Sequence, residues 1–132
     1  MAPFLTRDAI LQADDLLWED VEVPEWGGTV RVRGLTGAER DAFEAEMVER
    51  KGKKLRMDMQ NFRARLVVRS VVDEDGKRLF TDRDAASLGD KSAAALQRVF
   101  DVAQRLSGLS EQDVAELVGN FDEGQSDDST SD

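Results

Sequence analysis

Apolar side chains recur with the period of a helix in two stretches of the chain. They fall at every third or fourth position, as Leu55, Met59, Phe62 and Leu66 in the first stretch and as Leu96, Val99, Phe100, Ala103 and Leu106 in the second. This spacing places them on one face of a helix. It predicts helices over about 55–72 and 91–106, and Gly108 is a typical C-terminal stop for the second.

Residues 21–33 alternate instead between apolar and polar side chains. Two valine-rich runs flank a Gly-Gly pair at 27–28, which can form both central positions of a two-residue hairpin turn. The resulting register has three pairs that can be checked: Trp26 with Thr29, Val23 with Val32, and Glu22 with Arg33. The alternative is a longer loop over Pro-Glu-Trp-Gly-Gly. Because Pro24 cannot donate a hydrogen bond, we expect its strand at a sheet edge.

Helix starts are marked by a Ser or Thr followed three positions later by an acidic residue. This capping-box pattern occurs three times, at Thr36 and Glu39, Thr81 and Asp84, and Ser110 and Asp113. It satisfies N–H groups of the first turn and predicts helices over about 37–50, 82–88 and 111–118. Thr6, with Asp8 in the following turn, predicts a short helix over 7–16.

The end of the chain has nothing to bury. No apolar side chain follows Phe121, and such a segment cannot offset the entropy lost on ordering. Residues 122–132 are therefore predicted to be a disordered, acidic Ser/Asp tail. The elements before it predict a single domain over 1–121 of the α+β class, mainly α-helical with an N-terminal β-hairpin.

The composition argues against an enzyme. The 132 residues include no Cys, no His and no Tyr, which removes thiolate nucleophiles, the commonest general base and the commonest transition-metal ligands. The Gly-Lys pair at 52–53 lacks the other residues of a phosphate loop, and Asp73 and Asp75 precede a glycine that comes too early for a calcium loop. We expect no catalytic residues, no cofactor and no metal.

The sequence also predicts no membrane partner. The apolar runs are far shorter than the ~20 residues that span a bilayer. The first residues carry no basic segment followed by an apolar stretch, so a secretory signal is not expected.

Charge is distributed unevenly along the chain. The formal net charge is −10, yet residues 50–69 hold 8 basic side chains and 1 acidic side chain. This stretch is interpreted as a solvated face, as a contact for a protein partner or the acidic tail, or as a contact for nucleic acid. The acidic character of the chain and the single stacking aromatic, Phe62, disfavour nucleic acid, and we expect no nucleic-acid partner.

Two residues of the hairpin are further candidates for partner contact. In the predicted register Trp26 lies on the charged face near Arg31, where ring and guanidinium can stack, and Trp is enriched at interface hot spots. The alternative is packing of Trp26 beneath a helix, and Trp18 is expected in the core. The candidate partner-binding residues are therefore Trp26, Arg31, Lys51, Lys53, Lys54 and Arg56.

Most of the chain up to Phe121 resembles a known family. The resemblance is carried by Asp14-Asp15-Leu16, by VEVPEWGG at 21–28 and by VRVRGLTGAERD at 30–41. It continues in DEDG at 73–76, Leu79-Phe80, KSAAAL at 91–96 and AQRLSGL at 103–109. These segments resemble tail assembly chaperones of the long-tailed, siphovirus-type phages and prophages of actinobacteria.

The resemblance implies a non-enzymatic assembly factor. Such proteins bind the long helical tape measure protein, keep it soluble and promote assembly of the tail tube around it. They act in the cytoplasm of the bacterial host and leave before the virion is complete. Many are made in two lengths by ribosomal frameshifting. This chain is then the short product, and the tail tube protein and its own extended form are further partners.

Two other functions are compatible with the sequence. A structural tail completion or connector subunit would form rings and persist in the virion. A small regulatory nucleic-acid-binding protein would bind DNA with a steep salt dependence.

Overall fold

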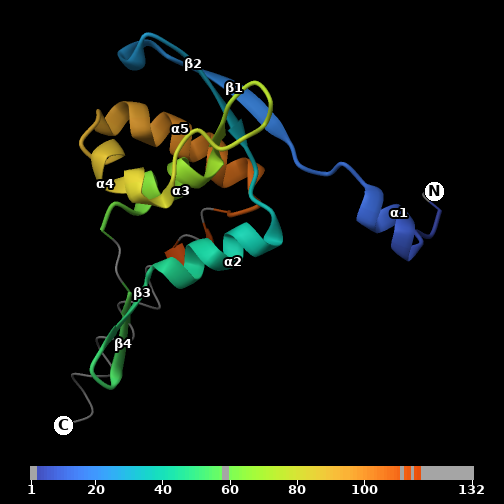
Figure 1. The fold of residues 1–132 in the computed structure, drawn as a ribbon, viewed down its shortest axis with the longest axis horizontal. Helices are drawn as coiled ribbons and strands as arrows, with labels where there is room; N and C mark the ends of the chain where they lie inside the picture. Colours follow the sequence, from blue (N-terminus) through green and yellow to red (C-terminus); the bar gives the residue numbers. More distant parts are fainter. Residues whose placement is uncertain (1–2, 58–59, 111, 114, 117–132) are drawn as a thin grey trace.

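The computed structural model describes residues 3–57, 60–110, 112–113 and 115–116 (Figure 1). Its main sheet is antiparallel, with strands β1 (Trp18–Val23), β2 (Gly28–Arg33) and β5 (Val71–Val72) in the order β1-β2-β5. β1 lies at an edge, as Pro24 predicts. The combination of this sheet with several helices confirms the α+β class.

The core lies between the sheet and two helices. α5 (Ala93–Leu106) packs against β1, β2 and α3 (Phe62–Ser70), and the valines on the inner face of the sheet, Val21, Val23 and Val32, are buried. Aromatic rings continue the core toward α2 (Gly37–Glu46). Phe62 lies between Phe43 and Phe100, with centroid distances of 5.6 Å to each.

The two-residue turn predicted for the hairpin is wrong, and the longer loop is right. A 3-10 turn, η1 (Pro24–Trp26), and Gly27 at φ 79° connect the strands. The register pairs Val23 with Gly28, Glu22 with Thr29 and Val21 with Val30. Each residue of β1 therefore pairs four positions away from the predicted partner. Because side chains alternate with a period of two, this even shift keeps the valines on one face.

The helices predicted over 37–50 and 55–72 are both too long. Residues 48–57 form a second hairpin, β3 (Val48–Lys51) and β4 (Lys54–Met57), where Lys51 pairs with Lys54. Gly52 adopts φ 65° in its turn, a conformation that a helix interior cannot use. Leu55 lies in β4 rather than on α3, Val71 lies in β5, and Met59 is outside the described residues.

The capping residues predicted from the sequence do begin helices, although several of these helices are shorter than predicted. Thr6 caps α1 (Arg7–Gln12), and the capping boxes at Thr36 and Thr81 both form. The second box opens η2 (Asp82–Asp84), which continues as α4 (Ala85–Leu88). Ser110 and Asp113 exchange hydrogen bonds of 2.9 and 3.0 Å. Most of the helix predicted over 111–118, and the tail over 122–132, lie outside the described residues.

Candidate protein-binding surface

The outer face of the sheet carries a fixed aromatic and charged cluster. The guanidinium carbon of Arg31 lies 4.0 Å from the centre of the Trp18 ring, and the guanidinium donates to both carboxylate oxygens of Asp20 at 2.9 and 3.3 Å. This hydrogen bonding lowers the pKa of Asp20 and raises the pKa of Arg31. Trp18 nevertheless stays 56% exposed. We call Trp18, Asp20 and Arg31 the Trp–Arg platform.

A groove of about 360 Å³ adjoins the platform at the β5 edge of the sheet. Leu79, which is 55% exposed, lines it together with Val72. Asp73 and Glu74 also lie along it. A groove that combines apolar with acidic side chains fits a segment that presents apolar side chains next to basic ones.

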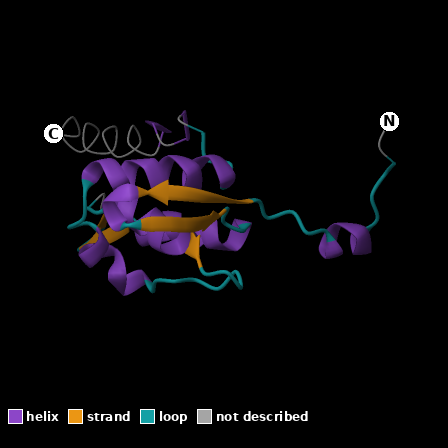
Figure 2. Ribbon diagram, turned by 90° about the horizontal axis from the view of Figure 1, so that it is seen from above, coloured by secondary structure: helices purple, strands orange, loops and turns teal. Residues whose placement is uncertain are grey.

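The N-terminal arm, residues 3–17, carries five of the eight large apolar side chains that are exposed in the described part of the chain. These side chains, Phe4, Leu5, Ile10, Leu11 and Leu17, are each more than half exposed, whereas Leu16 is partly buried. α1 buries no residue, and in Figure 1 and Figure 2 it stands apart from the body at the end of an extended segment. Contiguous exposed apolar groups of this kind mark interaction sites.

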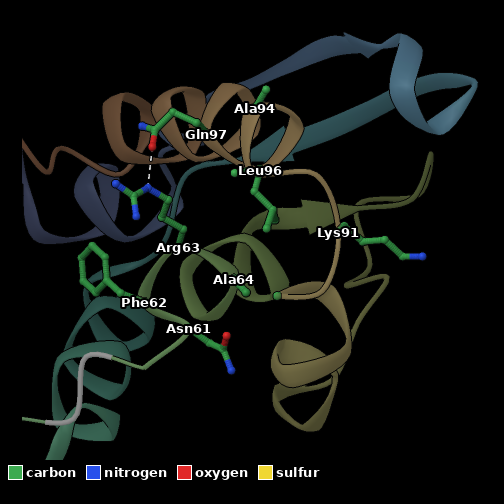
Figure 3. Close-up of a pocket in the computed structure, with 10 residues that line it drawn as sticks. Asn61, Phe62, Arg63, Ala64, Lys91, Ala94, Leu96 and Gln97 are labelled. Carbon is green, nitrogen blue, oxygen red and sulfur yellow. Dashed lines mark hydrogen bonds between the residues drawn. The ribbon is translucent and has the colours of Figure 1, made fainter.

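A larger cleft, of about 610 Å³, lies between the start of α3 and the start of α5 (Figure 3). Leu96 and Ala64, both buried, line it together with the exposed Ala94. Its ionisable residues are Arg63 and Lys91. Arg63 donates to Gln97 of α5, and Lys91 forms no ion pair with any residue that the structure describes.

The structure separates the predicted partner-binding residues into different places. Trp26 is half-buried in η1 and packs against the core, and its buried Nε1 donates to no atom of the described part of the chain. Arg31 stacks on Trp18 instead. The prediction that Trp26 and Arg31 stack is therefore wrong, and so is the prediction that Trp18 lies in the core.

The four predicted lysine and arginine residues lie on the second hairpin. Lys53 and Lys54 are exposed, whereas the structure describes only the backbone of Lys51 and Arg56. This hairpin and the β1–β2 hairpin lie at opposite sides of the body in Figure 1, so the six residues do not form one patch. A binding role for each of them stays a prediction.

The sequence analysis did not identify Trp18 and Leu79 as residues of an exposed surface, although the sequence contains a signal that Trp18 is exposed. Trp18, Asp20 and Glu22 have the same parity along the strand, opposite to that of Val21 and Val23. A residue that alternates with the core valines points away from the core. For Leu79, no comparable sequence pattern exists.

Neither a membrane span nor a metal centre is found in the part of the chain that the structure describes. No helix there has the length and apolar character needed to cross a bilayer. No three metal-binding side chains gather there in a way that would hold an ion.

The chain is similar to a known protein family. A family model described as phage tail assembly chaperone matches residues 6–117. No curated protein and no solved structure matches the chain.

Proposed function

Because the family match covers most of its length, the chain belongs to the phage tail assembly chaperone family, and we propose that it binds helical segments of the tape measure protein through the outer face of its sheet. A chaperone role requires a protein-binding surface rather than catalytic groups. The platform and the adjoining groove are such a surface.

The exposed Trp18–Arg31 stack is the observation that carries this proposal. Trp and Arg are, together with Tyr, the residue types enriched among interface hot spots. Asp20 accepts a hydrogen bond of 2.9 Å from Nε of Arg31 and so holds the guanidinium over the ring. Little side-chain entropy therefore remains to be lost on binding. An amphipathic client helix can place one apolar side chain in the groove beside Leu79 while its next turn covers Trp18.

The proposal also includes how the chaperone stays soluble on its client and how it is released during tail assembly. Many copies along one client must stay soluble, and a net charge of −10 favours this through mutual repulsion. Release without nucleotide hydrolysis requires a modest affinity for each copy, about −8 kcal/mol or micromolar. We place this activity in the host cytoplasm and expect the chain to be absent from the mature virion. We propose further that the chain is the short product of a frameshifted pair, acting with its extended form and the tail tube protein.

Co-expression with the tape measure protein tests the proposal. The parent chain is expected to keep the client soluble and to co-purify with it, whereas W18A/L79A loses most of the soluble complex. V48A is the matched control, because Val48 is an exposed apolar residue, 44% accessible, on the other hairpin. Circular dichroism checks that each variant is folded. A client that stays equally soluble with W18A/L79A overturns the outer face as the site.

Two further measurements separate the remaining possibilities. Reversing the charge of Lys53 and Lys54 tests whether the β3–β4 hairpin is a second contact for the tape measure protein. If it is, the variant should bind the client less tightly than the parent, and the difference should become smaller as the salt concentration is raised. Detection of the chain in purified particles would favour a structural subunit over a chaperone that leaves.

A further inference from the structure

We infer that the N-terminal arm of one copy docks in the α3–α5 cleft of a second copy, so that copies associate head to tail. This inference concerns contacts between chaperone molecules and does not depend on where the client binds. It rests on three features: an arm whose helix α1 buries no residue, a cleft of opposite charge, and their positions on the molecule.

The arm has the properties of a segment that becomes ordered against a partner. Thr6 caps α1 by accepting from the N–H of Ala9 at 3.2 Å, with Leu5 before the cap and Ile10 four residues after it. These are the two positions of a hydrophobic staple, which directs both side chains to one side of the helix. A helix this short is marginal in isolation, and here no core contact supports it.

The cleft offers the complementary chemistry. It combines a buried apolar lining, from Ala64 and Leu96, with the cations of Arg63 and Lys91. The arm carries Asp8, Asp14 and Asp15 against a single Arg7, and Arg7 already pairs with Asp8 at 3.0 Å. The remaining acids of the arm can therefore face the side chain of Lys91, which forms no ion pair within the described part of its own chain.

The positions of arm and cleft favour contact between copies over contact within one. In Figure 1 the arm extends from the start of β1 at one end of the molecule, whereas α4 and the start of α5 lie at the other end. Figure 2 shows the same projection of α1 away from the body. An arm at one end and its receptor at the other form a heterologous contact, which builds rings or open chains of molecules.

Sedimentation velocity of the full chain at increasing concentration tests this inference. The parent is expected to form dimers and larger species. I10E/L11E, in the arm, and K91E/A94E, in the cleft, are each expected to stay monomeric. All four residues are exposed, so thermal melting should show that both variants are folded. W18A/L79A is the control and should associate like the parent, which separates this contact from client binding.

An equimolar mixture of the two defective variants gives the most specific result. One variant keeps an intact cleft and the other an intact arm, so the mixture should form a 1:1 dimer that grows no further. A contact between two arms would give no such dimer. A parent that is monomeric at every concentration, variants that associate like the parent, or a mixture without the dimer overturns the inference. Association that is lost on deleting residues 122–132, but not in I10E/L11E, would assign the cleft to the tail instead.

Discussion

At the scale of single residues, Gly34 fixes how closely the sheet approaches α5. A Cβ atom at this position would lie 2.3 Å from the carbonyl oxygen of Leu106, which is backbone and cannot rotate away. The end of β2 and the end of α5 are therefore held at a distance that only glycine permits. Gly37, three residues later at the start of α2, has open space around it.

Gly34→Ala is expected to lower the free energy of unfolding by about 1–3 kcal/mol, the usual cost of forcing atoms into a packed site. Urea denaturation measures this cost. Gly37→Ala is the control and should change stability by less than about 0.5 kcal/mol, as most surface substitutions do. Equal stability of Gly34→Ala and the parent would mean that the strand end and the helix end move apart easily.

The residue scale also shows where sequence reasoning on the site reached its limit. The parity of the strand indicates that Trp18 points away from the valines, but its large apolar ring favours burial. The structure resolves this conflict because no helix of the described fold covers the ring, which is 56% exposed. Which face of a sheet stays uncovered depends on the whole fold and is not a property of one strand.

At the scale of elements, an ion pair joins the hairpin turn to α5. The guanidinium of Arg98 donates to both carboxylate oxygens of Glu25 at 2.7 and 3.0 Å. This hydrogen bonding lowers the pKa of Glu25 from 4.5 to about 2. Because the pKa is lower in the folded state, the pair stabilises the fold above pH 4.5, and its contribution is lost as the pH falls toward 2.

Glu25→Gln is therefore expected to reduce the acid sensitivity of the fold. At pH 7 the variant should unfold at a lower urea concentration than the parent, and the two midpoints should converge as the pH approaches 2. Glu22→Gln is the control, since Glu22 lies in the same hairpin and forms no ion pair in the described part of the chain. Parallel pH profiles for Glu25→Gln and the parent would contradict the assignment.

A second group of charges joins α2, α3 and η2. The side chain of Arg69 is only 11% exposed and donates to Glu46 at 2.9 Å and to Asp82 at 3.2 Å. Each acid has another cation nearby, Arg65 at 3.8 Å for Glu46 and Arg78 at 2.8 Å for Asp82. Without the two acids, Arg69 would therefore lose both of these ion pairs, whereas without Arg69 each acid would keep its other cation.

Removing the acids should cost more than removing the arginine. E46A/D82A leaves a buried guanidinium unpaired, and we expect it to lower the free energy of unfolding by about 3 kcal/mol. R69M keeps the apolar stem and leaves each acid with its other cation, so its cost should be clearly smaller. Urea denaturation of both variants checks this order, and the reverse order would show that the acids stabilise the fold independently of Arg69.

The elements that sequence reasoning predicted correctly are those with local signals. The bond from the N–H of Glu39 to the Thr36 hydroxyl, 3.1 Å long, connects residues three positions apart, and the stripe from Leu96 to Leu106 is equally local. The β3–β4 hairpin was missed because each of its strands has only four residues, and because Leu55 of β4 also fits the helical spacing of Met59, Phe62 and Leu66. The length of the β1–β2 turn was missed because Pro24 and Trp26 form a compact 3-10 turn that a Gly-Gly pair does not indicate.

At the scale of the whole molecule, the N-terminal arm differs from the body both in its position and in its lack of buried side chains. The buried side chains of the body extend from Val21 to Leu109. The arm contributes none of them, and five of its apolar side chains are more than half exposed. We therefore expect the arm to contribute little to the stability of the body.

A chain that begins at Asp14 is expected to unfold at the same urea concentration as the parent and with the same slope, because the slope follows the surface buried on folding. The same truncation should abolish association between copies. Leu109→Ala is the contrasting control near the other end, because Leu109 is 2% exposed and its truncation should cost about 2–5 kcal/mol. A truncated chain that is less stable by more than about 0.5 kcal/mol would mean that the arm packs on its own body, and the cleft would then be filled from within the same molecule.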